Sequence, residues 1–217
     1  MASLDTKEQI LDAAEELFAD RGFDATSLRT ITSKAGVNLA AIHYHYGSKE
    51  ALIEAVLCRR LDDLNRERLE LLDEYEATAG DDALELEPLL ESFLGPPLRL
   101  SADPARRAEL FIRLLGHAYT QPGDFLVKLF TTRFGGLVQR YLTAFGRALP
   151  ELPPEEVVWR FHFMIGIMAH TMAGMHKMGS LGVHVTPASD MDAIIARLVT
   201  FVAAGMRATV DVRHQGE

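Results

Sequence analysis

The sequence has few of the features that mark secreted, membrane or disulfide-rich proteins. Its 217 residues contain one cysteine, Cys58, which excludes a disulfide framework and a thiolate zinc cluster. No stretch of about 18 uninterrupted apolar residues occurs, so we expect no transmembrane helix. The first ten residues carry Asp5, Lys7 and Glu8, where a signal peptide would be apolar. We therefore expect a soluble, cytoplasmic protein.

Positive charge is also scarce, because 22 Lys and Arg stand against 31 Asp and Glu, a formal net charge of −9. This balance excludes a uniformly basic surface for nucleic acid but allows a local basic patch. Residues 25–49 contain no acid and carry Arg29, Lys34 and Lys49. The segment is either a nucleic-acid site or a solvated turn region that lacks acids by chance.

Helical spacing dominates the sequence. All nine prolines lie at or after Pro88, and apolar residues recur three or four apart, beginning with Ile10, Ala13 and Leu17. We expect helices over residues 5–21, 26–35, 38–44, 48–72, 86–94, 103–115, 125–149, 155–178 and 189–210. No alternating strand pattern lasts five residues. The sequence therefore predicts an all-α protein of about nine helices.

Caps and helix breakers define several of the expected ends. Gly36 suits a left-handed C-cap, and Thr26 or Ser27 suits the N-cap of the second helix. Ser189 suits the N-cap of the last helix. We expect the run Gly95-Pro96-Pro97 to end the fifth helix, because proline has no N–H for the helical hydrogen bond.

A helix, a tight turn at Gly36 and a short helix form a helix-turn-helix pattern. The surrounding residues 26–52 read TSLRTITSKAGVNLAAIHYHYGSKEAL. This stretch resembles the DNA-binding signature of the TetR family of bacterial transcriptional regulators. The matching residues are Thr26, Ile31, Ala35, Gly36, Val37, His45, Ser48, Lys49, Glu50 and Leu52. His43 departs from the signature, since the family usually has tyrosine there.

The resemblance implies a helix-turn-helix DNA-binding domain over residues 1–47 and a ligand-binding and dimerisation domain over residues 48–217. It implies a homodimer, paired through its last two long helices, that reads a pseudo-palindromic operator and is released by a small apolar effector. The runs 38–41 and 44–49 are similar to a subgroup that controls fatty-acid metabolism. That similarity implies a fatty acid or acyl-CoA as effector. No cofactor or metal is expected.

Eleven residues are the expected DNA contacts: Thr26, Ser27, Arg29, Asn38, Leu39, Ala40, Ala41, His43, Tyr44, His45 and Lys49. Backbone N–H groups at the start of the second helix are suited to a phosphate. The small side chains of Ala40 and Ala41 allow close approach in a major groove. Asn38 either caps its helix or contacts a base, and Lys49 resembles the family's phosphate-binding lysine.

The expected effector contacts are Arg113, His117, Phe163, Met164, Met168, His170 and Met172. The three methionines are four residues apart and form either plain core or a deformable pocket wall. Arg113 and His117 are polar groups on an apolar helix, where they either meet an effector carboxylate or lie at the surface. A neighbouring stripe of His162, Gly166, His170 and Gly174 permits close helix approach and suits a dimer seam.

Enzyme motifs are missing from the sequence. It contains no G-x-S-x-G, no H-E-x-x-H and no phosphate-binding glycine loop. We therefore expect no catalytic activity. The remaining alternative to a DNA-binding regulator is a helical ligand-binding module without DNA binding, against which the intact Lys49 and its acid-free surroundings argue.

Overall fold

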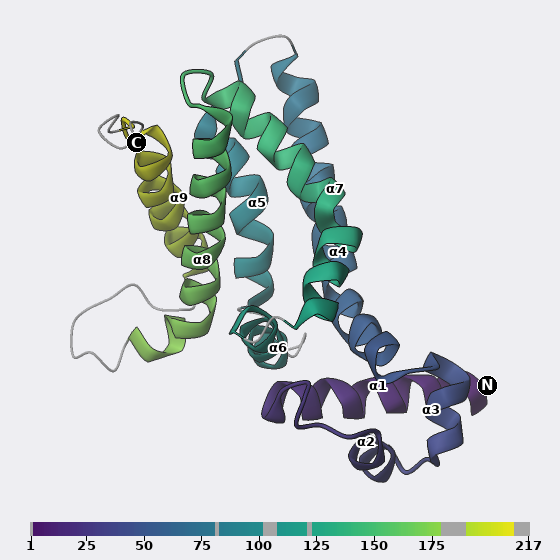
Figure 1. Ribbon diagram of the computed structural model, residues 1–217. Helices are drawn as coiled ribbons and strands as arrows, with labels where there is room; N and C mark the ends of the chain where they lie inside the picture. Colours follow the sequence, from purple (N-terminus) through teal and green to yellow (C-terminus); the bar gives the residue numbers. More distant parts are fainter. Residues whose placement is uncertain (1, 81–82, 102–107, 121–122, 179–189, 211–217) are drawn as a thin grey trace, which may run out of the picture. The chain divides into compact units, whose positions relative to one another are not determined.

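The computed structural model describes residues 2–80, 83–101, 108–120, 123–178 and 190–210. These residues form nine α-helices and no strands (Figure 1), which confirms the all-α prediction. The helices are α1 (Ala2–Arg21), α2 (Leu28–Ala35), α3 (Leu39–Tyr46), α4 (Lys49–Ala79), α5 (Leu86–Ser101), α6 (Ala108–Thr120), α7 (Asp124–Ala148), α8 (Pro154–Met178) and α9 (Met191–Arg207). Over the described ranges, none of them is long and apolar enough to span a bilayer.

Contacts divide the chain into two compact units. The first contains Met1–Asn65 and Asp103–Phe134, and the second contains Arg66–Ala102 and Gly135–Glu217. Helices α4 and α7 therefore each contribute one part to each unit. The contact grouping adds α6 and parts of α4 and α7 to the three N-terminal helices, whereas the boundary predicted from the sequence lies between residues 47 and 48. The predicted division into a DNA-binding domain and a ligand-binding domain at that boundary stays a prediction.

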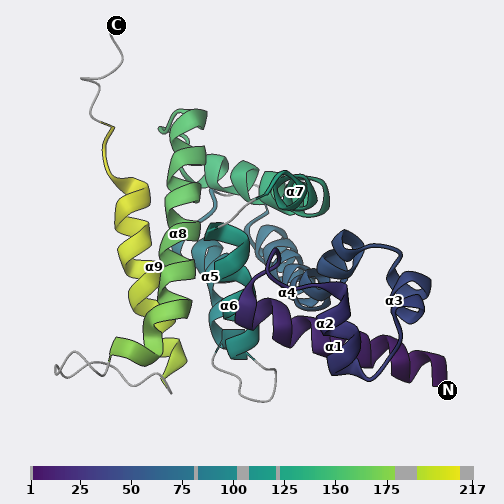
Figure 2. The same cartoon turned by 60° about the horizontal axis from the view of Figure 1, so that its bottom comes forward.

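In the first unit, α1 contacts α2, α3 and α6 (Figures 1 and 2). Its core includes the fully buried side chains of Phe18, Ile31 and Ile42. Buried Glu15 of α1 pairs with two arginines of α4, at 3.2 Å from Arg59 and 3.4 Å from Arg60. A buried carboxylate needs such partners, so these pairs fix the first part of α4 against α1.

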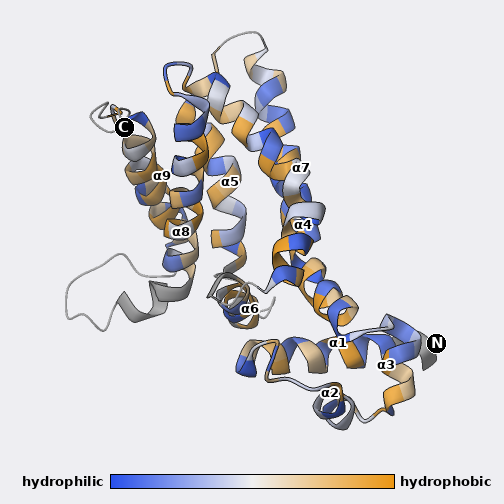
Figure 3. Ribbon diagram, in the orientation of Figure 1, coloured by the Kyte–Doolittle hydropathy of each residue, from blue (hydrophilic) through white to orange (hydrophobic). Residues whose placement is uncertain are grey.

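In the second unit, α5 contacts both α8 and α9, which also contact each other (Figure 2). Aromatic rings join α5 to α7 and α8, with ring centroids 4.8 Å apart for Phe93 and Tyr141 and 5.1 Å apart for Phe93 and Phe161. Hydrophilic and hydrophobic residues alternate along the helices of both units (Figure 3), as one-sided burial requires.

The expected break in the fifth helix is wrong. Helix α5 continues through Pro96 and Pro97 to Ser101. Proline inside a helix costs about 3 kcal/mol, but both prolines and their neighbours Gly95 and Leu98 are buried in this unit. Packing of α5 against α8 and α9 outweighs the lost hydrogen bonds, and the sequence alone does not reveal that packing.

Several other helix ends differ from expectation. Helix α4 continues to Ala79, beyond the expected end at residue 72, and helix α6 ends at Thr120, beyond the expected end at residue 115. Helix α1 begins at Ala2, three residues before the expected start at residue 5. Helix α9 begins after Asp190, whose carboxylate accepts a hydrogen bond from the Ala193 N–H at 3.2 Å. The cap predicted at Ser189 lies outside the described residues.

Candidate nucleic-acid interface

Side-chain caps determine where α2 and α3 begin and end. Ser27 Oγ accepts a hydrogen bond from the Thr30 N–H at 3.1 Å, and Asn38 Oδ1 accepts one from the Ala41 N–H at 2.9 Å. Between the helices, Gly36 adopts φ 67° in the left-handed region, which glycine reaches without steric cost. Asn38 therefore caps α3 through its side-chain oxygen. The residue is also exposed, and its amide nitrogen is not used by the cap.

Burial of one side of α3 determines which side faces outward. Ile42 is fully buried, whereas Leu39, Ala40, His43 and Tyr44 are exposed. These four residues, which we call the recognition face, follow the i, i+1, i+4, i+5 spacing of one helix side. Tyr44 is 82% exposed and Leu39 is 39% exposed, so two apolar surfaces project into solvent here.

The imidazole of His43 is oriented by the end of α3. Its Nδ1 lies 2.9 Å from the Gly47 carbonyl oxygen, so Nδ1 carries the proton and donates. Nε2 is then the ring nitrogen that is available to a ligand. His45 is half-buried at the edge of the face, with its ring centroid 5.0 Å from that of Tyr44 in an edge-on arrangement.

Tyr46 attaches α3 to α1, a role that the sequence did not predict. Its hydroxyl donates to the Lys7 carbonyl oxygen at 2.9 Å. Burial, with the Glu8 carboxylate as the next cause, raises the pKa of Tyr46 from 10.0 to about 12. The phenol therefore stays neutral and keeps donating at ordinary pH.

The cations of the acid-free segment differ in how they are engaged. Lys34 pairs with Glu16 at 2.7 Å. Arg29 is exposed, and over the described residues its guanidinium has no hydrogen bond or ion pair. Lys49 Nζ makes one long contact, 3.4 Å from the Asp24 carbonyl oxygen. Arg29 and Lys49 therefore keep a positive charge that no described carboxylate neutralises.

The start of α4 is organised by Ser48 and Glu50. Ser48 Oγ accepts a hydrogen bond from the Ala51 N–H at 3.1 Å and so caps the helix that carries Lys49. The pKa of the exposed Glu50 carboxyl is lowered because its own backbone N–H, and then the Ser48 hydroxyl, donate to it. The cap holds the backbone of Lys49 in place.

Thr26 requires a correction. It is 0% exposed, and its hydroxyl donates to the carbonyl oxygens of Gly22 at 2.8 Å and Leu17 at 3.2 Å. A residue without exposed surface cannot touch DNA, so we remove Thr26 from the expected contacts. It joins the start of α2 to the end of α1, and Ser27 is the cap.

The expected effector residues are distributed over the two units. Arg113 pairs with Asp20 at 2.7 Å, and His117 Nε2 lies 3.2 Å from the Ala19 carbonyl oxygen, so both engage α1 in the first unit. The three methionines of α8 are buried in the second unit. Phe163 and His170 lie on the exposed side of α8, with Phe163 58% exposed. Their role in binding an effector stays a prediction.

A buried cation in the second unit was missed. Arg68 of α4 is 5% exposed. It follows Leu61 and Leu64 and precedes Leu72 at helical spacing, so it occupies a position in an apolar stripe. An arginine in such a stripe was the signal in the sequence that could have identified it. Over the described residues, no three His, Cys, Asp or Glu side chains gather as a metal site would require.

The capped α2, the turn at Gly36 and the outward face of α3 define a helix-turn-helix DNA-binding protein. The profile of the bacterial regulatory proteins of the tetR family matches residues 10–56, and that of the tetracyclin repressor-like C-terminal domain matches residues 91–205. The second match covers more than half of the chain. The chain belongs to the TetR family of DNA-binding transcriptional regulators.

Similar proteins share mainly the N-terminal segment. The transcriptional repressor KstR2 of Rhodococcus jostii is 40% identical over 58 residues, 27% of this chain and 28% of that protein. The transcriptional activator FasR of Mycolicibacterium smegmatis is 43% identical over 56 residues, 26% of each chain. The matched segment thus spans less than a third of these relatives.

Solved structures show the same fold along most of the chain. The secondary repressor NalD of the MexAB-OprM multidrug efflux pump in Pseudomonas aeruginosa has a TM-score of 0.61 at 19% identity, covering 94% of this chain and 97% of that one. AmtR of Mycobacterium smegmatis has a TM-score of 0.59 at 22% identity, covering 90% and 85%. At these identities the likeness concerns the fold alone.

Proposed function

We propose that this protein is a homodimeric repressor that binds a pseudo-palindromic operator and is released by a small apolar effector, a fatty acid or an acyl-CoA. The observation that carries the DNA-binding part is the recognition face of α3. It projects from a helix whose opposite side is anchored by Ile42 and Tyr46, and Arg29 and Lys49 stand in the same acid-free segment.

On DNA, we assign base contacts to the recognition face and phosphate contacts to its flanks. Leu39, Ala40 and Tyr44 present apolar or aromatic surface to base edges and thymine methyl groups. The exposed amide nitrogen of Asn38 and Nε2 of His43 supply hydrogen bonds beside them. Ala41 and His45 are half-buried and complete the edge of the contact.

Phosphate contacts come from the starts of two helices. The N–H groups at the beginning of α2, after exposed Ser27, suit a phosphate oxygen. Lys49 at the start of α4 and Arg29 on α2 add positive charge. Such contacts set affinity and register, and base edges set sequence preference.

Dimerisation is assigned to the exposed apolar side of α8 and α9. Trp159 and Phe163 are 52% and 58% exposed, and their rings stack with centroids 5.9 Å apart. Phe201 of α9 is 67% exposed. Large apolar surfaces of this kind mark interaction sites. A second copy with the same face gives a two-fold interface that presents two α3 helices to one DNA duplex.

Release by the effector is a shift between dimer states that differ in DNA affinity. Helix α4 is the element we assign to this coupling, because it begins at Lys49 in the first unit and ends at Ala79 in the second. The buried methionines Met164, Met168 and Met172 are the effector wall, because unbranched thioether side chains adapt to irregular shapes.

A salt-titrated selection on genomic DNA fragments tests this proposal. A regulator enriches a few fragments, and its affinity falls steeply with salt. Tyr44→Ala should abolish the enrichment, whereas Val127→Ala, which removes an exposed apolar side chain of α7, should not change it. Enrichment of no fragment by the wild type would favour a helical ligand-binding module without DNA binding, and enrichment by Tyr44→Ala equal to that by Val127→Ala would contradict the base contact assigned to Tyr44.

A further inference from the structure

The imidazole of His43 is connected to the residue that ends α3. The Gly47 N–H donates to the His43 carbonyl oxygen at 3.0 Å, and His43 Nδ1 lies 2.9 Å from the Gly47 carbonyl oxygen. The backbone and the side chain of His43 are thus both bonded to the same glycine. The ring is oriented before DNA arrives, so less conformational entropy is lost when it binds.

The contact with Gly47 determines which ring nitrogen carries the proton. A carbonyl oxygen can only accept a hydrogen bond, so Nδ1 has to donate. A neutral imidazole has one N–H, and Nε2 is then an unprotonated nitrogen with a lone pair. Over the described residues, the ring makes no second hydrogen bond. Neutral His43 therefore presents an acceptor to solvent and no N–H donor.

Small neighbours leave this acceptor accessible. His43 is exposed, and so are Ala40, three residues before it, and Gly47, four residues after it. Apart from the chain neighbours of Gly47, no atom of the described residues lies within 4 Å of the position that a Cβ on Gly47 would take. The edge of a base pair can therefore approach His43 without meeting a bulky side chain at either of these two positions.

An acceptor discriminates among the groups that DNA presents. Phosphate oxygens are acceptors themselves, so an unprotonated Nε2 cannot form a hydrogen bond with them. In the major groove, adenine N6 and cytosine N4 carry N–H donors, whereas guanine N7 and O6 and thymine O4 are acceptors. A lone pair that is placed against one of those acceptors loses its water and gains no partner, which lowers affinity. Neutral His43 therefore fits a base amino group.

We propose that His43 is a specificity-determining residue that accepts a hydrogen bond from the amino group of one adenine or cytosine in each half-site of the operator. This inference rests on the proposed DNA-binding function and states which group of the base His43 reads. It separates neutral His43 from the phosphate contacts assigned to Arg29 and Lys49. Guanine and thymine are disfavoured where the lone pair of Nε2 faces them.

Nuclear magnetic resonance of the DNA-free, full-length protein tests the protonation pattern. Histidine labelled with heavy nitrogen is measured at about pH 8, where an imidazole is mainly neutral. Loss of signals in His43→Gln assigns the two ring nitrogens, whose chemical shifts distinguish a protonated from an unprotonated nitrogen. We expect the proton on Nδ1 and none on Nε2. A proton on Nε2 would overturn the proposal.

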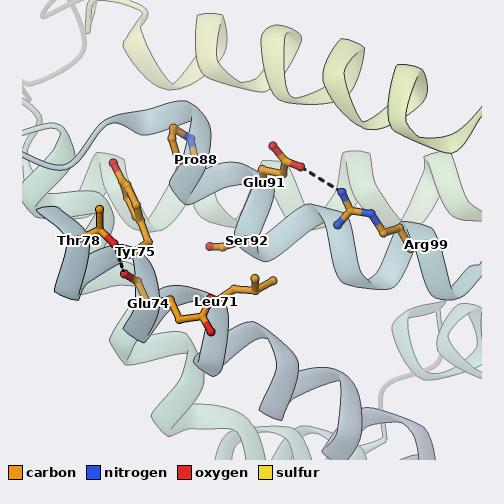
Figure 4. Close-up of a pocket in the computed structure, with 8 residues that line it drawn as sticks. All are labelled: Leu71, Glu74, Tyr75, Thr78, Pro88, Glu91, Ser92 and Arg99. Atoms are coloured by element: carbon orange, nitrogen blue, oxygen red, sulfur yellow. Dashed lines mark hydrogen bonds and ion pairs between the residues drawn. The ribbon is translucent and has the colours of Figure 1, made fainter.

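Selection from random duplexes at the same pH tests the base preference. The wild type is compared with His43→Lys, because a lysine ammonium only donates. At one position per half-site, the wild type should select adenine or cytosine and His43→Lys should select guanine, which presents two acceptors. The control, Thr78→Lys, adds the same charge at an exposed residue of α4 that lines an open groove with Glu74 (Figure 4) and should keep the wild-type preference.

Removal of the amino group from the selected base tests the contact itself. An analogue in which hydrogen replaces the amino group is placed at that position in both half-sites, and anisotropy gives the affinities of the wild type and His43→Ala for both duplexes. The double-mutant cycle cancels the change in the duplex. The wild type should lose about fivefold more affinity per half-site than His43→Ala, as expected for one net hydrogen bond.

Three results on DNA would overturn the proposal: the same preference in the wild type and His43→Lys, a wild-type preference for guanine or thymine at the position that His43→Lys changes, or equal losses on removal of the amino group. If one substitution prevents folding, the nitrogen measurement and the remaining variants decide. Any of these results with sequence selection by the wild type intact refutes the His43 contact and leaves the DNA-binding regulator standing. Absence of any selection by the wild type refutes the proposed function itself, and this inference with it.

Discussion

Replacement of Lys49 by alanine gives the most quantitative test of the proposed DNA contacts. The structure predicts little loss of stability, because Lys49 is half-buried and makes one long hydrogen bond of 3.4 Å to the Asp24 carbonyl oxygen. A typical net hydrogen bond contributes about 1 kcal/mol, and a long one less. The variant should therefore fold normally and differ from the wild type only on DNA.

The expected effect on DNA follows from counterion release. Each neutralised phosphate contributes about 0.9 to the slope of log affinity against log salt, so two Lys49 side chains in a dimer contribute about 1.8. Between about 50 and 200 mM salt, a fourfold change, this slope corresponds to about 12-fold in affinity. The ratio of the wild-type DNA affinity to the Lys49→Ala DNA affinity should therefore fall about 12-fold between about 50 and 200 mM salt.

Fluorescence anisotropy with a labelled duplex measures both slopes. A duplex of arbitrary sequence suffices, because phosphate contacts do not depend on base sequence. Lys128→Ala is the control, since it removes an exposed lysine of α7 outside the acid-free segment. An unchanged salt slope for Lys49→Ala would show that Lys49 does not touch a phosphate and would refute this assignment.

Three further predictions concern Arg29 of α2, the dimer and the fold. Arg29→Gln should change the ranking of enriched fragments if Arg29 reads a base, and a uniform loss would instead assign it to a phosphate. Trp159→Glu should give monomers in sedimentation velocity, because it places a charge in the proposed apolar interface, and a persistent dimer would contradict that interface. Tyr46→Phe should lower the free energy of unfolding by about 1 kcal/mol in urea titrations through loss of the bond to the Lys7 carbonyl. Because folding raises the Tyr46 pKa from 10.0 to about 12, the stability from its neutral phenol is complete below pH 10 and is lost as pH rises to 12. The phenylalanine variant should lose less stability in that range, and an equal loss would show that Tyr46 is not the titrating group.

The positions of α2 and α3 were predictable because their signals are local. Ser27 and Asn38 cap helices that begin at the next residue, and Gly36 supplies the left-handed turn between them. Each of these effects involves atoms within four residues of one another, so the sequence contains all the partners. The spacing of Ile42 against the outward residues of α3 likewise follows from helical geometry.

The candidate site beyond α3 was less predictable because it depends on distant partners. Thr26 matches the family signature, yet it is buried and its hydroxyl donates hydrogen bonds to the carbonyl oxygens of Leu17 and Gly22. Arg113 and His117 have the chemistry of effector contacts, yet Asp20 and Ala19 of α1 engage them. In each case a partner from another helix determines what the side chain is free to do.

The sequence by itself determined an all-helical protein, a helix-turn-helix head and the family to which the chain belongs, because capping, periodicity and signature residues act over short stretches of chain. The tertiary structure alone decided that α5 passes through Pro96 and Pro97, that Phe163 faces outward, and that Arg68 is buried beside Phe93 and Met168. Burial depends on which helices pack together, and a contact such as that of Arg68 with Met168 joins residues 100 positions apart. Helix-forming tendencies and local caps carry no information about contacts between distant helices. The position of Arg68 in an apolar stripe is readable in the sequence, but its partners Phe93 and Met168 became visible only in the folded protein.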